Sequence, residues 1–174
     1  MPSLRLVVAC GMLLAVSLAV SGCGGLQPLY GTTSSTGNSV ASALAEVEVT
    51  PIPGRVGQQV RNELIFKTTG GDGRSEAPLY RLQIVLKETA ASELVDRDAD
   101  VGAVVYGLTS DYQLIRVADN TVLHQGRAVA RAPYDKVKSI FADIRARRDA
   151  EDRAARSLAD SIRTQVAAVL SKAG

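Results

Sequence analysis

The alternation of apolar and polar residues predicts three successive β-strands in the middle of the chain. From Tyr80 to Leu86 every second side chain is apolar, which is the period of a half-buried strand. The same alternation runs from Val104 to Leu114, and it returns from Val122 to Ala130 after a turn at residues 118–121. The last two strands are therefore expected to form an antiparallel hairpin. A shorter strand is predicted within Ala45–Thr50.

Apolar residues spaced three and four apart predict two helices. Val56, Val60 and Leu64 indicate a short amphipathic helix that ends before the glycine-rich loop at residues 70–73. A second helix from Ser139 to Leu170 would be about 45–50 Å long at 1.5 Å per residue. Its apolar stripe is expected to cover the sheet and consists of Phe141, Ile144, Ala155, Leu158, Ile162, Val166 and Val169.

The predicted order of elements is strand, helix, three strands and helix. This order indicates an α+β fold: a two-layer α/β sandwich in which two helices pack on one face of a four-stranded mixed sheet. The other face of the sheet is expected to be more polar, and it carries Arg81, Gln83, Lys87, Gln113, Gln125, Arg127 and Arg131.

The N-terminal residues 1–22 have the pattern of an export signal. An Arg precedes an uncharged apolar run from Leu6 to Val20, which is shorter than the about 20 residues of a transmembrane helix. Ser21 and Gly22 then precede Cys23, and small residues before a cysteine are typical of a lipoprotein cleavage site. Residues 1–22 are therefore predicted to be removed and Cys23 to be lipidated. The alternative is a secreted or membrane-anchored protein in which this cysteine is incidental.

Lipidation would leave the mature chain without a free thiol. Cys10 lies within the predicted signal, and Cys23 would be acylated, so neither a disulfide nor a cysteine-based metal site is expected. The acyl chains would hold the protein at a membrane. Gly24 rather than Asp follows the lipidated residue, which favours the outer membrane by resemblance to the sorting rule of enteric bacteria.

Composition and charge indicate the organisation of the chain from Cys23 onward. Residues 23–43 are rich in Ser, Thr and Gly, and we expect a lipidated N-terminus and flexible tether there, followed by a single domain at residues 44–174. Aromatic residues make up only 4% of the chain and Trp is absent, so the core is expected to consist of Val, Leu, Ile and Ala. The net charge of +2 is not the profile of a nucleic-acid-binding protein.

Residues suited to catalysis are scarce in this sequence. His124 is the one histidine, no Gly-x-Ser-x-Gly turn accompanies it, and the loop at residues 70–73 lacks the ending of a phosphate loop. The carboxylates lie in mixed-charge stretches such as Asp149–Arg153, which are typical of a solvated helix face. We therefore expect a binding or structural protein with no cofactor and no metal, rather than an enzyme.

Four segments of the chain carry a family resemblance. The cleavage site continues into Gly24–Gly31, and Val49–Leu64 ends in the sequence Arg-Asn-Glu-Leu. Pro78–Leu82 and Asp149–Ala155 follow in the same order, so the similarity covers nearly the whole chain. In combination these segments resemble LptE, the family of lipopolysaccharide-assembly lipoproteins. No single segment is a catalytic motif, and the chain stops at Gly174, where some members of the family carry a long tail.

The resemblance implies an outer-membrane lipoprotein that acts as a plug and assembly partner of the LptD β-barrel. Together the two proteins would deliver lipopolysaccharide to the outer leaflet. A compact domain with a mixed-charge surface suits this role because the lumen of such a barrel is polar. The alternative is a generic envelope lipoprotein that serves as an accessory or structural tether of another outer-membrane assembly or secretion machine. A lipid-anchored hydrolase would have only His124 for its chemistry.

Exposed arginine and lysine side chains are the expected contacts for lipopolysaccharide. Its phosphates and acidic sugars are anionic, and the guanidinium group binds phosphate oxygens in pairs. The candidates are Arg97, in the connection after the second predicted strand, and Lys136, Lys138, Arg145, Arg147 and Arg148. The alternative is that these are solvated charges. Arg147 and Arg148 would then pair with Glu151 and Asp152 four residues later, and each pair would contribute about 0.2–0.5 kcal/mol.

Overall fold

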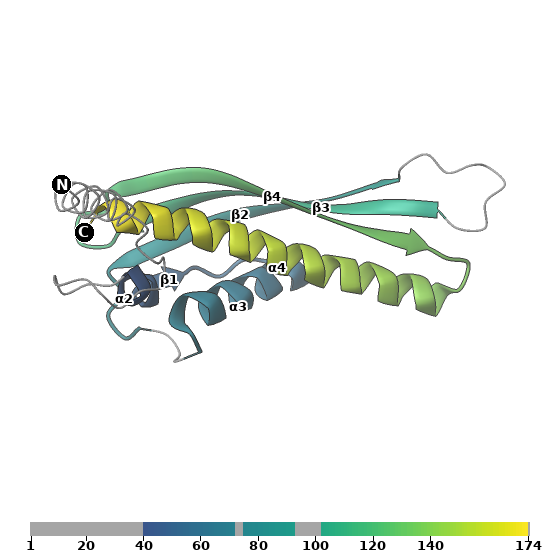
Figure 1. The fold of residues 1–174 in the computed structure, drawn as a ribbon, viewed down its shortest axis with the longest axis horizontal. Coiled ribbons are helices and arrows are strands. Elements are labelled where there is room, and N and C mark those ends of the chain that lie inside the picture. The colour runs from purple at the N-terminus through teal and green to yellow at the C-terminus, as the bar shows by residue number, and fades with distance from the viewer. Residues whose placement is uncertain (1–39, 72–74, 93–101, 174) are drawn as a thin grey trace, which may run out of the picture. The chain divides into compact units, whose positions relative to one another are not determined.

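A computed structural model describes residues 40–71, 75–92 and 102–173, all of which lie in one compact unit. The elements in chain order are α2 (Val40–Ala45), β1 (Val47–Val49), α3 (Arg55–Thr69), β2 (Tyr80–Ser92), β3 (Gly102–Arg116), β4 (Val122–Lys136) and α4 (Ile140–Ala173). They form an α+β fold in which helices cover one face of a four-stranded sheet (Figure 1). The predicted fold class is confirmed. None of the described helices is long and apolar enough to cross a bilayer.

The sheet is mixed and has the strand order β1-β2-β3-β4. β1 runs parallel to β2, whereas β2, β3 and β4 are successively antiparallel. β3 and β4 form the predicted hairpin, whose turn contains Asn120 with a positive φ of 53°. β2 and β4 are longer than predicted, because the pairing with β3 continues to Ser92 and to Lys136 respectively.

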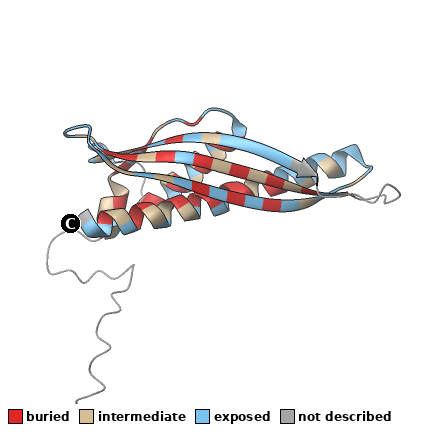
Figure 2. Ribbon diagram, turned by 90° about the horizontal axis from the view of Figure 1, so that it is seen from above, coloured by how far each residue is buried: buried red, intermediate tan, exposed pale blue. Residues whose placement is uncertain are grey.

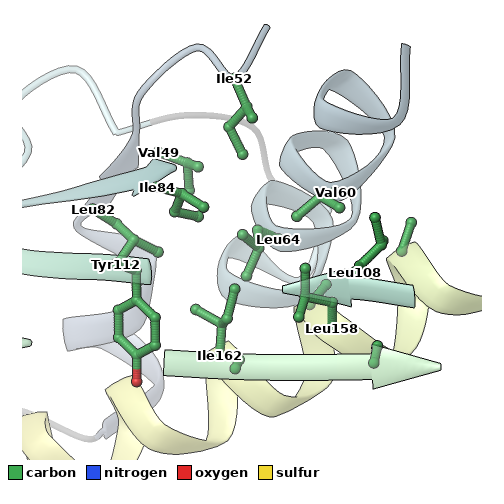
Figure 3. Close-up of a cluster of buried hydrophobic side chains, with 14 of the residues drawn as sticks. Val49, Ile52, Val60, Leu64, Leu82, Ile84, Leu108, Tyr112, Leu158 and Ile162 are labelled. Atoms are coloured by element: carbon green, nitrogen blue, oxygen red, sulfur yellow. The ribbon is translucent and has the colours of Figure 1, made fainter. Parts of the chain in front are cut away.

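The hydrophobic core lies between the helices and the inner face of the sheet (Figures 2 and 3). Strand residues alternate between buried and exposed, so the even-numbered side chains of β3 from Val104 to Leu114 face the helices. Three alanines of β4 are buried beneath the helical layer, and their small size lets α4 pack closely on this strand. Six large apolar residues in this core are 0% exposed: Val60, Leu64, Leu108, Leu114, Leu158 and Ile162.

The outer face of the sheet is polar, as the sequence predicts. All seven polar residues expected on this face have odd numbers in the strands, opposite to the buried positions of β2, β3 and β4. On this face Arg127 of β4 donates a hydrogen bond of 2.6 Å to Asp111 of β3, and this bond lowers the pKa of the carboxyl group. Val85 and Val129 are apolar exceptions, with 74% and 52% of their surface exposed.

The described domain begins earlier than the sequence indicated. The predicted tether extends to residue 43, but α2 already begins at Val40 and buries Leu44 against the core. The short helix has no charged residue and few large apolar side chains, so its composition resembles the Ser- and Gly-rich segment before it. α3 matches the prediction and continues to Thr69, where Gly70 ends the helix with a left-handed φ of 67°.

Candidate functional site

The predicted basic residues gather where β4 ends and α4 begins. Lys136 is the last residue of β4, and Lys138 lies in the short connection to the helix. Arg145, Arg147 and Arg148 belong to the first turns of α4, and all five side chains are exposed. The structure therefore brings these candidates to one end of the sandwich. Two other predicted positions, the lipidation site Cys23 and the candidate Arg97, lie outside the described residues.

The first turns of α4 carry exposed apolar side chains beside these cations. Ile140 is 74% exposed, Phe141 83% and Ile144 45%. The prediction that Phe141 and Ile144 belong to the core-facing stripe is therefore wrong. In the described chain, the first buried residue of α4 is Ala150.

This exposure follows from the length of the neighbouring helix. α4 has 34 residues and α3 only 15, so α3 can flank only part of its partner. Arg55 at the start of α3 contacts Glu151 and Asp152, and Lys67 near its end contacts Asp160. The residues of α4 before Ala150 therefore lie beyond the start of α3, where the second helix no longer completes the core (Figure 1).

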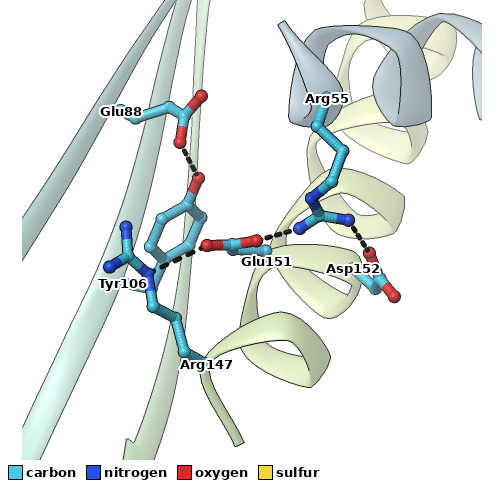
Figure 4. A network of polar contacts seen from close by, with 6 residues as sticks. All are labelled: Arg55, Glu88, Tyr106, Arg147, Glu151 and Asp152. Atoms are coloured by element: carbon cyan, nitrogen blue, oxygen red, sulfur yellow. Dashed lines mark hydrogen bonds and ion pairs between the residues drawn. The ribbon is translucent and has the colours of Figure 1, made fainter. Parts of the chain in front are cut away.

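A network of ion pairs marks the boundary between the packed and the exposed part of α4 (Figure 4). Glu151 is almost buried, with 9% of its side chain exposed, and it accepts hydrogen bonds from both Arg55 and Arg147. Arg147 Nε lies 3.0 Å from Glu151 Oε1, which confirms the pairing considered for this residue. Arg148 does not pair with Asp152, which instead lies 3.4 Å from Arg55.

Tyr106 of β3 extends this network toward the sheet. Its hydroxyl group donates a hydrogen bond of 2.6 Å to Glu88 Oε2 on β2 (Figure 4). Burial of the ring and the hydrogen bond to Glu88 both raise the pKa of Tyr106 above its ordinary value, so the group stays protonated. Ion pairs thus join α3 to α4 at this end, and a separate hydrogen bond joins β2 to β3 beside them.

Three cations remain available for a ligand at this end. Among the described residues, Lys136, Arg145 and Arg148 form no ion pair. Arg145 lies one turn after Phe141, and Arg148 lies one turn after Ile144, so the two cations are neighbours of the two apolar side chains on the same helix surface. We call Lys136, Phe141, Ile144, Arg145 and Arg148 the α4 entry surface. Such a surface can bind an amphiphile through an anionic group and a hydrocarbon chain.

The cations of this surface are predictable from the sequence, whereas the periodicity places its apolar residues in the core. The sequence does contain an indication that this part of the helix is exposed. Arg148 follows Ile144 at the spacing at which a core-facing stripe would place another apolar residue. His124, the other residue considered for chemistry, is half-buried on the helix-facing side, where its ring centroid lies 5.8 Å from that of Tyr112.

The fold of this chain is similar to folds of known structure. No family model and no curated protein matches this chain. The fold is similar to that of a lipoprotein candidate from Caulobacter crescentus CB15, at 23% identity and a TM-score of 0.64 over 79% of this chain and 98% of that chain. A minor lipoprotein from Acinetobacter baumannii is 18% identical, with a TM-score of 0.49 over 70% of this chain and 90% of that chain. The Caulobacter structure establishes a shared fold.

Proposed function

We propose that this chain is an outer-membrane lipoprotein that acts as plug and assembly partner of the LptD β-barrel and binds lipopolysaccharide. The export signal and Cys23 support the lipid anchor, and the four segments that resemble LptE support the barrel partnership. The lipoprotein part of the proposal agrees with the description of the Caulobacter protein, whose fold this chain shares. In this role the protein binds and positions its ligand and catalyses no reaction.

The single observation that carries the ligand proposal is the composition of the α4 entry surface. Lipopolysaccharide combines phosphate groups with hydrocarbon chains. Arg145 and Arg148 are exposed cations without an ion-pair partner among the described residues, so binding of a phosphate would not have to break an existing pair. Phe141 and Ile144 are exposed beside them, and burial of their surface by a hydrocarbon chain is favourable at about 25 cal/mol per Å².

The remaining basic residues have different roles in this proposal. Arg147 pairs with Glu151, so a ligand that binds this guanidinium group would compete with an existing ion pair. Lys136, on the adjacent strand end, adds positive charge to the same surface. Arg97 lies outside the described residues and remains a proposed contact.

Charge reversal tests the anionic half of the site. The double variant Arg145→Glu and Arg148→Glu should bind lipopolysaccharide at least about tenfold more weakly, because each lost charge-assisted hydrogen bond is worth about 1.5–3 kcal/mol. The matched control is Arg156→Glu and Lys172→Glu, which makes the same change in net charge on exposed positions later in α4. Equal binding by the two double variants would contradict the proposed site.

Replacement of the apolar residues tests the other half. The double variant Phe141→Ser and Ile144→Ser should weaken binding of intact lipopolysaccharide but leave binding of the deacylated form unchanged. Thermal unfolding should also stay unchanged, because both side chains are exposed in the folded protein. An equal loss of affinity for intact and for deacylated lipopolysaccharide would show that these residues do not bind the hydrocarbon chains.

The second candidate function is that of a generic envelope lipoprotein that tethers or assists another machine. The observation that favours it is that the Caulobacter crescentus protein, whose fold this chain shares, is described only as a lipoprotein. Such a protein would keep the lipid anchor but would neither copurify with an LptD barrel nor prefer lipopolysaccharide over other anionic lipids.

A further inference from the structure

Glu151 of α4 is a buried carboxylate that two arginines from different helices share. Its side chain is only 9% exposed, and its two oxygens have different partners. Oε1 accepts a hydrogen bond of 3.0 Å from Nε of Arg147, whereas Oε2 accepts a hydrogen bond from Arg55. Figure 4 shows the two guanidinium groups on opposite sides of the carboxylate. Loss of either contact therefore leaves Glu151 with one charged partner.

Arg55 holds this carboxylate from the neighbouring helix. It is the first residue of α3, and its Nη1 atom also lies 3.4 Å from Asp152 of α4. Arg55 thus contacts two neighbouring carboxylates of α4 at once, which fixes its guanidinium group between the helices. A buried carboxylate that loses its last charged partner strongly destabilises a fold. Arg55 therefore determines how much Glu151 depends on Arg147.

Arg147 is held less firmly than Arg55. It lies one turn before Glu151 on the same helix, and ion pairs at this spacing contribute little to stability. Only its Nε atom contacts the carboxylate, and the two terminal nitrogens form no hydrogen bond with any residue that the structure describes. The side chain is 56% exposed. A phosphate group can therefore reach the terminal nitrogens while Nε is still bound to Glu151.

Arg147 is also a neighbour of the α4 entry surface. It follows Ile144 by three residues and Arg148 follows Ile144 by four, so both arginines lie next to this apolar side chain on the helix. An amphiphile with its hydrocarbon chain on Ile144 would bring its anionic group close to both. Arg148 forms no ion pair within the described ranges, whereas Arg147 has to be drawn away from Glu151.

We propose that Arg147 is a conditional contact for the anionic group of the ligand, and that Arg55 is the positioning residue that makes this contact possible. The ligand is the lipopolysaccharide of the proposed function, on which this inference rests. A phosphate group competes with Glu151 for Arg147, and Arg55 keeps the buried carboxylate paired while Arg147 binds the phosphate. Arg55 does not touch the ligand, because it lies on the other side of Glu151 (Figure 4).

Binding of lipopolysaccharide to variants of the full chain in detergent tests this exchange. Arg147→Gln and Arg55→Gln should each weaken binding about tenfold, because either change removes the same charge-assisted hydrogen bond from the complex. The double variant should bind no more weakly than either single variant, since both changes act on one contact. Losses that multiply in the double variant would indicate two independent charge effects and would overturn the proposal. Unchanged binding by Arg55→Gln would overturn it as well.

Neutralisation of Glu151 distinguishes the exchange from a merely structural role of Arg55. Glu151→Gln removes the charge that holds Arg147, so it should strengthen binding by the parent protein and restore binding in the Arg55→Gln background. The matched control is Asp149→Asn, which removes a carboxylate that pairs with Arg153 and should have no comparable effect. Equal gains from the two changes would show an effect of net charge alone and would contradict the exchange.

The conservative variant Arg55→Lys keeps a positive charge beside Glu151. It should retain most of the affinity of the parent protein, and it preserves the test if Arg55→Gln does not fold. A tenfold loss in this variant, despite the retained charge, would speak against the proposal.

Urea unfolding without ligand tests the sharing of Glu151 by itself. Arg147→Gln should lower the unfolding midpoint several times more in the Arg55→Gln background than in the parent protein, because only there does the buried carboxylate lose its last partner. Equal shifts in the two backgrounds would overturn the proposal. Absence of lipopolysaccharide binding by the parent protein would contradict the proposed function, and the exchange with it. Binding by the parent that Arg55→Gln leaves unchanged would contradict the exchange alone.

Discussion

Two apolar residues of α4, fourteen positions apart, should respond very differently to truncation. Leu158 is 0% exposed and belongs to the core between α4 and the sheet. Ile144 is 45% exposed and lies in the part of α4 that extends beyond the start of α3. Leu158→Ala removes about three buried carbon atoms, worth about 0.8 kcal/mol each, and leaves a cavity in addition. We expect it to lower the free energy of unfolding by about 3–4 kcal/mol. Ile144→Ala should lower it by less than about 1 kcal/mol.

Urea unfolding of the two variants, followed by circular dichroism in the same detergent, measures this difference directly. The slope of the unfolding free energy against urea should stay unchanged, so that the shift in midpoint reports stability. Similar losses of unfolding free energy for the two variants would show that α4 packs against the core along its whole length, as the apolar stripe in its sequence predicts. That result would also remove Ile144 from the α4 entry surface. Leu158→Asp should cost still more, because it would bury a carboxyl group without a partner.

Three further predictions concern the anchor, the tyrosines and the sheet. Cys23→Ser should leave an unprocessed precursor on a denaturing gel, and membrane-bound protein of mature size would refute the lipidation site. Burial raises the pKa values of Tyr106 and Tyr112, so both hydroxyl groups should ionise above the ordinary pKa of about 10 in a spectrophotometric titration. The stability that these protonated groups contribute should be lost as the pH rises above that value. Tyr106→Phe should remove one late-ionising group. Gly126→Ala should lower the thermal midpoint, since the added Cβ would clash with the ring and the hydroxyl group of Tyr112.

The fold was predictable because most elements carry one consistent pattern. Alternation along β3 and the spacing of Val56, Val60 and Leu64 agree with the faces that the structure buries. α2 was not predicted because six residues, of which only Val40 and Leu44 are larger than Ala or Ser, give too short a pattern for the periodicity of a helix. The lengths of β2 and β4 were underestimated, because Ala, Thr and charged residues near their ends do not alternate in hydrophobicity although their backbones pair with β3.

The candidate site was only partly predictable, for a geometric reason. Periodicity shows that Phe141 and Ile144 can share a helix face with Leu158, but it does not show where the neighbouring helix begins. That information lies in the contact between Arg55 and Glu151, which are far apart in the sequence. Arg147 was a candidate for the ligand, whereas the structure places it in an ion pair with Glu151.

Copurification from intact outer membranes tests the proposed function most directly. The full chain, with an affinity tag after Gly174, would be extracted in mild detergent and isolated together with whatever remains bound. The proposed function predicts a stoichiometric complex of this protein with an LptD β-barrel, and this complex carries lipopolysaccharide. The Arg145→Glu and Arg148→Glu double variant should still bind the barrel, but its complex should contain no lipopolysaccharide. Recovery of the lipidated protein without that barrel would contradict the proposed function and favour a generic envelope lipoprotein.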